Sequence, residues 1–254
     1  AERATDKCAT SIDGFGKETK EATQIAFDFG RTLKENLANT AIDVAKAAAS
    51  SMTSSILDAE SAQRQFQAAT GTSEAQMKSY ISVMNELHTN NYGEDINDVA
   101  QSMALVKQYT NELNPEKLAK MTENGIAMQD VFDMDLSETI RGVTALVTNM
   151  GVNSDQAFDL MATGAQRGLN KSGELADNIA EYSQLWGQAG FAAEDMFAIL
   201  ENGLESGAYN LDKVNDFVKE FTISLADGRI EEHLDSFSTE TQMLFNNWKA
   251  GKVT

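Results

Sequence analysis

Proline is almost absent from this sequence, and cysteine occurs only once. The 254 residues contain one proline and one cysteine, Cys8, whereas proline averages about 5% of ordinary proteins. Because a proline inside a helix removes a backbone hydrogen bond and clashes with the preceding turn, its scarcity favours helices. A single cysteine cannot form a disulfide within the chain, so the fold does not require an oxidising compartment. The first prediction is an all-α protein.

Basic residues and long apolar runs are also scarce. The chain has 20 Lys and Arg against 39 Asp and Glu, and 20 − 39 gives a net charge of −19. Such a charge repels phosphate backbones and anionic lipid head groups. The longest stretch without a charged residue covers 142–154, which is 13 residues and shorter than the roughly 20 that cross a bilayer. We therefore expect no specific nucleic-acid site and no transmembrane segment.

Residues that could carry catalysis or bind a metal do not form recognisable motifs. His88 and His233 lie far apart, and with one cysteine they do not give the spacing of zinc ligands. The pair Gly16-Lys17 lacks the rest of a phosphate-binding loop, and neither Gly-x-Ser-x-Gly nor His-Glu-x-x-His occurs. We therefore expect no enzymatic activity, no catalytic residues, no cofactor and no metal site.

Three aspartates, Asp130, Asp133 and Asp135, are the remaining candidates for cation binding. Their alternate spacing lacks the glycine and the terminal glutamate of a calcium loop. Acidic residues are also favoured near the start of a helix, where they interact with the helix dipole. The interpretation we favour is a helix that begins after Asp135, and calcium binding is the minor alternative.

A long segment without glycine or proline runs from residue 31 to residue 70. Small and apolar residues recur along it with a 4-4-3 spacing, at Leu33, Leu37, Ala41, Val44, Ala48, Met52, Ser55, Ala59, Gln63 and Phe66. An eleven-residue repeat corresponds to about 3.67 residues per turn, which suits a straight rod. A helix of about 40 residues would be on the order of 60 Å long. We predict an extended helical rod over 31–70, preceded by a short helix and linker over 1–30. Two ordinary helices separated near residues 50–51 are the alternative.

From residue 71 onward, signals for a helix start recur every fifteen to twenty residues. Ser73, Asp135 and Asn153 each place a side-chain acceptor at an N-cap, with an acid or amide three positions later. The only proline, Pro115, follows Asn114 at a first helical position, where its missing N–H costs nothing. These signals predict short helices at roughly 73–89, 94–111, 115–130, 136–150, 154–168, 173–188, 193–206, 211–226 and 238–250.

These short helices belong to an internal repeat with a period of 39 residues. Residues 151–168 align with 190–207, and one period earlier Gly125 aligns with Gly164. A repeat of about 40 residues that contains two amphipathic helices is typical of an α-solenoid, in which each hairpin buries its apolar face against its neighbours. We predict a helical-repeat domain over 71–254. It would contain three clear helix pairs and one degenerate leading pair, which makes a stack of about four helix hairpins.

The repeat also predicts which side chains are buried. Gly125, Gly164 and Gly203 occupy one repeat position within a helix, where glycine costs roughly 1 kcal/mol relative to alanine. A close helix contact or a helix C-cap would explain a glycine there. Aromatic residues at helical spacing are expected to lie in the core rather than to bind a cofactor; they are Phe158, Tyr182, Trp186, Phe197 and Phe221.

Three parts of the sequence resemble the core region of tail tape measure proteins from tailed bacteriophages and prophages. They are residues 66–74, residues 92–100 and the glycine-containing helix pairs over 151–221, which follow an Ala- and Ser-rich helical segment. The resemblance covers roughly residues 30–250. The family is defined by a helical pattern with scattered glycines rather than by catalytic residues. The chain begins without a start methionine, and we interpret it as a piece of a longer polypeptide.

The resemblance implies a structural virion protein. Tape measure proteins set tail length, template assembly of the tail tube, occupy its lumen and leave the tail when DNA is delivered. A protein of this kind would be made in the bacterial host cytoplasm and would reside in the tail lumen or tip. Its partners would be tail-tube proteins and tail-tip or baseplate proteins, and it would form a homo-oligomer along the tail axis. A helical-repeat adaptor for protein–protein interaction, unrelated to phage, is the alternative. A fragment of a cell-wall-cleaving enzyme, which would need a catalytic glutamate in a cleft, ranks third.

Overall fold

The computed structural model describes residues 52–250, and every regular element in this range is helical. No β-strand occurs among these residues, so the all-α prediction is confirmed for them. The helices are α2 Met52–Thr70, α3 Glu74–Thr89, α4 Ile96–Thr110, α5 Pro115–Phe132, α6 Leu136–Met150, α7 Ser154–Gln166, α8 Leu175–Gln188, α9 Ala193–Glu205, α10 Leu211–Ala226, α11 Arg229–Glu232 and α12 Thr239–Lys249, with a 3-10 turn η2 at Leu234–Ser236.

Three of the predicted helix starts have the expected side-chain caps, whereas at Ser73 the hydroxyl and the backbone N–H both donate to Gln76 Oε1 instead. The Asn114 side chain accepts a hydrogen bond from the Lys117 N–H at 2.8 Å, and Asp135 accepts one from the Glu138 N–H at 2.9 Å. Asn153 caps α7 in the same way. Each cap satisfies a backbone donor that has no partner within its helix. The nine predicted helices therefore lie within a few residues of the observed ones, whereas the short α11 and η2 were not predicted.

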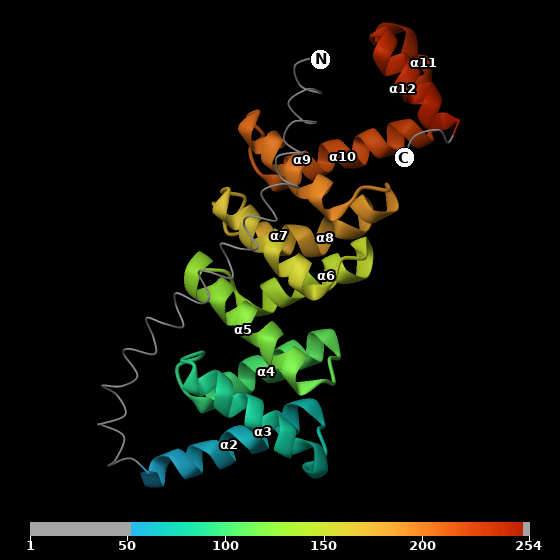
Figure 1. Cartoon of the computed structure of the whole chain (residues 1–254). Coiled ribbons are helices and arrows are strands. Elements are labelled where there is room, and N and C mark those ends of the chain that lie inside the picture. Colours follow the sequence, from blue (N-terminus) through green and yellow to red (C-terminus); the bar gives the residue numbers. More distant parts are fainter. Residues whose placement is uncertain (1–51, 251–254) are drawn as a thin grey trace.

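The helices are stacked along the length of the molecule from α2 to α12 (Figure 1). Consecutive helices from α2 to α10 contact each other, and each also contacts the next helix but one. This places α2, α4, α6, α8 and α10 in one row and α3, α5, α7 and α9 in a second row. That the stack forms a regular α-solenoid after a rod stays a prediction.

The N-terminal predictions fall largely on residues that the structure does not describe. The short helix and linker over 1–30, and the possible break near residues 50–51, lie outside the described range. Of the rod predicted over 31–70, residues 52–70 are described as the unbroken helix α2. This helix contacts α4 closely, and its Ala62 and Phe66 side chains are buried. The C-terminal part of the predicted rod therefore packs against the stack.

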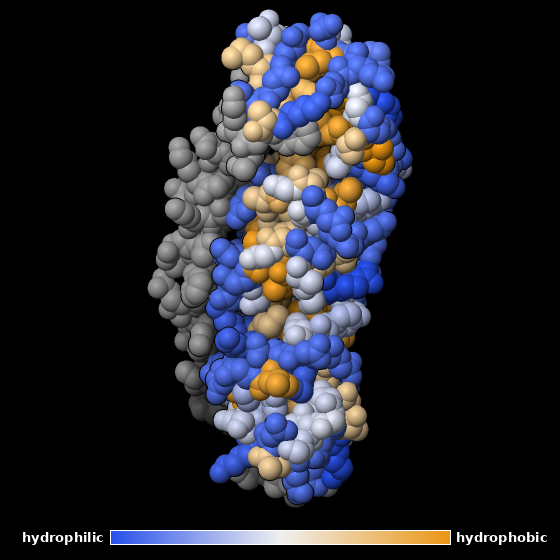
Figure 2. Space-filling model, turned by 90° about the vertical axis from the view of Figure 1, so that its right-hand side faces the viewer, coloured by the Kyte–Doolittle hydropathy of each residue, from blue (hydrophilic) through white to orange (hydrophobic). Residues whose placement is uncertain are grey.

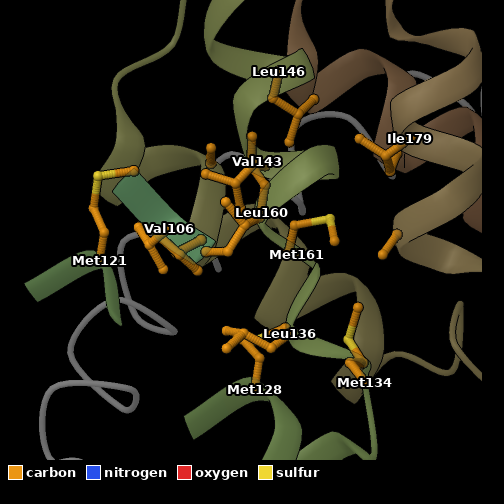
Figure 3. Packing of buried hydrophobic residues seen from close by; sticks show 14 of the residues in the cluster. Val106, Met121, Met128, Met134, Leu136, Val143, Leu146, Leu160, Met161 and Ile179 are labelled. Carbon is orange, nitrogen blue, oxygen red and sulfur yellow. The ribbon is translucent and has the colours of Figure 1, made fainter. Parts of the chain in front are cut away.

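The core follows the stack as a continuous band of apolar side chains. Fully buried large residues extend from Phe66 in α2 through Leu118 in α5 and Trp186 in α8 to Phe197 in α9. Figure 3 shows the central part of this band, where side chains from α4, α5, α6, α7 and α8 interdigitate. Burying one such side chain contributes about 1.5–3 kcal/mol. Each hairpin therefore obtains its stability from its neighbours, as expected for a linear array.

The three repeated glycines do lie at close helix contacts. A Cβ added to Gly125 would lie 2.5 Å from Leu136 Cδ1, and one added to Gly203 would lie 2.4 Å from Val214 Cγ2. Leu136 and Val214 are two periods apart, so these contacts are equivalent. Gly164 differs, because a Cβ there would lie 2.9 Å from the Phe197 ring of the next hairpin. Close packing therefore explains all three glycines. The residue that each glycine contacts follows the repeat at Gly125 and Gly203 but not at Gly164.

Glycines also end two equivalent helices in the same way. Gly168 follows α7 with φ +87°, and Gly207 follows α9 with φ +98°. At both sites the next N–H donates to a carbonyl five residues back, from Leu169 to Gly164 at 2.9 Å and from Ala208 to Gly203 at 3.0 Å. Only glycine adopts this left-handed conformation without strain. The glycine spacing in the sequence therefore reflects a repeated helix C-cap.

Candidate functional site

The aspartates considered for cation binding serve mainly to connect α5 and α6. Asp133 is the C-cap of α5 with φ 54°, and Asp135 is the N-cap of α6. Burial, and then the nearby charge of Asp98, raises the pKa of the Asp130 carboxyl. Within residues 52–250, no group of three or more His, Cys, Asp or Glu side chains is arranged to hold a metal ion. His88 lies in the last turn of α3 and His233 is the C-cap of α11, so the two histidines belong to separate elements.

A shallow depression lies beside the ends of α7 and α9. Its lining includes Arg167, Lys171, Glu201 and Tyr209. The Arg167 guanidinium forms a half-buried ion pair with Glu201 at 2.8 Å, which links α7 to α9. The depression therefore lies between two helices of the second row.

Helices α6 and α8 run parallel at very short distance. A Cβ added to Gly142 of α6 would lie 2.9 Å from the Ala176 carbonyl oxygen, and one added to Gly187 of α8 would lie 2.2 Å from the Asn149 carbonyl oxygen. The Asn149 side-chain amide donates to the Ser183 hydroxyl at 2.8 Å across the same interface. Glycine at both ends of the contact allows the backbones to approach. This is the closest helix–helix contact of the described stack; we call such a contact between neighbouring helices of one row a joint.

The next joint of the row, between α8 and α10, is built from buried polar groups instead. The Trp186 indole N–H donates to the side-chain Oδ1 of Asn215 at 2.7 Å, and the side-chain amide of Asn215 donates to the side-chain Oδ1 of Asn178. The Asn178 amide in turn donates to Asp212 at 2.7 Å. Asn178 and Asn215 are buried, so this chain of hydrogen bonds fixes how α10 lies on α8.

Replacing Asn215 with leucine should destabilise the protein by about 2–4 kcal/mol. The substitution keeps the side-chain volume but leaves the buried Trp186 N–H and Asn178 carbonyl oxygen without partners, and each unpaired group costs about 1–3 kcal/mol. Urea denaturation followed by circular dichroism would measure the loss. Asn246→Leu, at an exposed position of α12, is the matched control and should change stability by less than about 0.5 kcal/mol. Equal effects of the two substitutions would show that the network contributes nothing.

The net negative charge of the chain lies in residues 52–250, which form the helical stack. Residues 52–250 contain 12 Lys and Arg and 31 Asp and Glu, and 12 − 31 is −19. The remaining residues contain 8 of each kind, so their charges cancel. The stack therefore carries the whole net charge, which disfavours phosphate-rich partners and favours basic ones.

The stack coincides with a region shared with known proteins. The sequence model of the family described as phage-related minor tail protein matches residues 88–246, which is well over half of the chain. The chain belongs to this phage tail protein family. The resemblance to tail tape measure proteins is confirmed at the level of this family. Neither a curated protein nor a solved structure matches the chain.

Membership of the phage minor tail protein family makes this chain a virion-associated tail component. The matched region begins at the end of α3 and reaches into α12, so it contains every helix from α4 to α10. Membership of this family implies that its partners are other phage tail proteins. Among the described residues, no helix is long and apolar enough to cross a membrane.

This tail protein exposes apolar side chains on its surface, and most of the large ones lie toward the C-terminal end. Figure 2 shows one face of the stack, where apolar residues lie among predominantly hydrophilic ones. The exposed large apolar residues from α9 onward are Tyr209, Phe217, Phe221, Ile223, Phe237, Met243 and Leu244. Phe221 was expected in the core and is 42% exposed instead. Sequence periodicity missed this because burial of α10 depends on a following helix in its row.

Proposed function

We propose that this chain is a segment of a tail tape measure protein, which sets tail length, scaffolds assembly of the tail tube and takes part in DNA delivery. The observation that carries this proposal is the family match over residues 88–246, which spans a linear helical stack. The partners would be tail-tube proteins and tail-tip or baseplate proteins. Copies of the chain would assemble as a homo-oligomer along the tail axis.

The architecture suits the role because a linear array gains length with every added unit. Neighbouring helices in a row lie about 8–10 Å apart, so each hairpin would extend the molecule by about that amount. We propose the same division as the sequence indicated, with a linker over 1–30, a rod over 31–70 and an α-solenoid-like repeat domain over 71–254. A rod of helix would contribute length most efficiently, at about 1.5 Å per residue.

A helical-repeat adaptor unrelated to phage is the second candidate. Such an adaptor would also use a stack of hairpins to present a long binding surface. The family match favours the tail role over this alternative, since it assigns the stack itself to phage tails.

Deleting eleven residues from the rod tests the ruler role directly. Removal of residues 37–47 takes out one 4-4-3 unit, so the apolar seam stays in phase. We expect tails that assemble and are shorter by roughly 16 Å, or by whole tube rings if the tube adds length only in rings. Electron micrographs of purified particles would give the tail length.

The control replaces residues 37–47 with an equally long helical sequence that keeps the seam residues. This variant should give tails of normal length. If the deletion also gives normal tails, the segment does not act as a ruler and the adaptor becomes the better explanation.

A further inference from the structure

The joint between α2 and α4 has an open groove on its surface. The groove has a volume of about 530 Å³, and only residues of these two helices line it. Its walls are small and apolar, and they include Ala68 and Ala69 of α2 and Ala104 and Leu105 of α4. Ala68 and Ala69 are exposed, whereas Ala104 is buried. We call this surface the α2–α4 groove.

Three glutamines provide the polar groups of the α2–α4 groove. The Gln101 amide donates to the Gln65 side-chain oxygen at 3.2 Å, and the Gln108 amide donates to the Ala69 carbonyl oxygen at 2.8 Å. All three glutamines are exposed. Because a glutamine side chain carries both donors and acceptors, it can also pair with a glutamine of an identical surface. The polar groups of the groove are therefore complementary to themselves.

The α2–α4 groove lies in a part of the stack that has almost no charge. Residues 65–73 and 99–111 contain one charged residue, Lys107, among 22 positions. The described stack as a whole has 12 basic and 31 acidic residues, 43 in all, among 199 positions. Lys107 is buried and does not line the groove. Arg64, next to the first of these stretches, forms an ion pair with Glu60 at 3.4 Å. An approaching surface therefore meets no net charge at this groove.

The charge pattern indicates which partner can occupy the groove. Each copy of the stack carries a net charge of −19, so two copies repel each other except where charge is absent. A basic partner would instead be attracted to the acidic surfaces, and no carboxylate lines the groove. The residues before α2 are also a poorer occupant, because in the rod proposed over 31–70 they continue the α2 helix and do not turn back onto it.

We propose that two copies of this chain pack against each other through their α2–α4 grooves. In such a contact the same residues meet across a two-fold axis, so the alanines of one copy face those of the other and glutamines pair with glutamines. Small side chains allow helices to approach to about 8 Å. This contact gives the proposed homo-oligomer a surface, and it rests on that part of the proposed function.

Sedimentation equilibrium of the full chain tests the proposal. We expect a reversible dimer, whose dissociation constant falls when the salt concentration is raised from about 0.1 M to about 1 M. This change shortens the distance over which charges act from roughly 10 Å to roughly 3 Å, so it screens the repulsion between two acidic copies. A dimer held by opposite charges would weaken instead.

Charges placed at Gln101 show whether the dimer uses the groove. Gln101→Glu and Gln101→Lys each bring like charges together across the two-fold axis, so each should weaken its own dimer at least about tenfold. A mixture of the two variants should restore the dimer, because each mixed pair has one acidic and one basic side chain in the contact. Gln101 is exposed, so unchanged circular dichroism is expected.

The matched controls are Gln184→Glu and Gln184→Lys, because Gln184 is an exposed glutamine of α8 outside the groove. Both controls should dimerise like the original chain.

Three results would overturn the proposal. They are a monomer at every concentration, equal dimerisation of the Gln101 and Gln184 variants, and no recovery in the mixture. A monomer that Gln101→Glu destabilises more than Gln184→Glu does, as measured by thermal unfolding, would assign the groove to residues of the same chain. All these results concern the chain in solution, whereas the ruler role is tested by tail length, so the two proposals can fail separately.

Discussion

Removal of residues 151–189, which include the whole α7–α8 hairpin, should abolish tail assembly rather than shorten the tail in proportion. The cut joins Met150 to Gly190, and both Gly151 and Gly190 have positive φ angles, 73° and 84°. The new connection therefore keeps a glycine where α6 ends. Any defect would come from the lost packing and not from a strained junction.

The deletion places α10 where α8 was, and α10 does not fit against α6. Relative to the repeat, Asn215 would replace Ala176 and Ala226 would replace Gly187. In the intact protein a Cβ at Gly187 would already lie 2.2 Å from the Asn149 carbonyl oxygen. Larger residues at both ends of the contact would hold the two helices apart. Buried Asn215 would also lose its partner Trp186, which leaves a buried polar group unsatisfied.

Electron microscopy of particles that carry this deletion would show the result. We expect tailless heads or defective tails, whereas the eleven-residue deletion in the rod should give complete and shorter tails. Tails of normal structure that are shorter by one hairpin would contradict this expectation. They would show that the hairpins are interchangeable and that the joints are not specific.

The sequence predicts the helices well because their boundaries depend on local chemistry. Side-chain caps such as Asp135 and Asn153 act within one turn, so they can be recognised without knowledge of the fold. The glycine spacing was informative for the same reason, since Gly168 and Gly207 end equivalent helices in the left-handed conformation. The short elements α11 and η2 have no cap signal of this kind in the sequence, and they were not predicted.

The joints between hairpins could not be predicted, because they depart from the period that revealed the repeat. Gly142 and Gly187 lie at the two ends of the closest helix contact of the stack, between α6 and α8. One period later, however, residue 181 is a glutamate and residue 226 is an alanine. Positions that differ between repeats in this way cannot be recognised from the period. The exposure of Phe221 was missed for a related reason, since Phe221 continues the apolar stripe but no helix described in residues 52–250 follows α10 in its row to cover it. Helical periodicity indicates which face is apolar, whereas the neighbours decide whether it is buried.

Gly187→Ala is expected to destabilise the closest helix contact of the stack, the one between α6 and α8. The added methyl group would meet the backbone oxygen of Asn149 at 2.2 Å, and a backbone oxygen cannot rotate away as a side chain can. Helices α6 and α8 would have to separate, which also disturbs the hydrogen bond from Asn149 to Ser183. Overpacking of this kind costs about 3 kcal/mol, which exceeds the roughly 1 kcal/mol that alanine adds to helix stability relative to glycine.

Gly125→Ala is the matched control, because the same methyl group is added inside a helix of the same stack. At this site the nearest atom is Leu136 Cδ1 at 2.5 Å, the far end of a flexible side chain. A change of rotamer can relieve that contact, so the gain in helix propensity offsets much of the cost. We expect the stability of Gly125→Ala to lie within about 1 kcal/mol of that of the original protein. Thermal unfolding followed by circular dichroism should show a midpoint roughly 4–8 °C lower for Gly187→Ala, from a net loss of about 2 kcal/mol, and little change for Gly125→Ala. Equal midpoints for the two variants would show that α6 and α8 can separate at little energetic cost. Close packing at Gly187 would then not prevent one hairpin from replacing another.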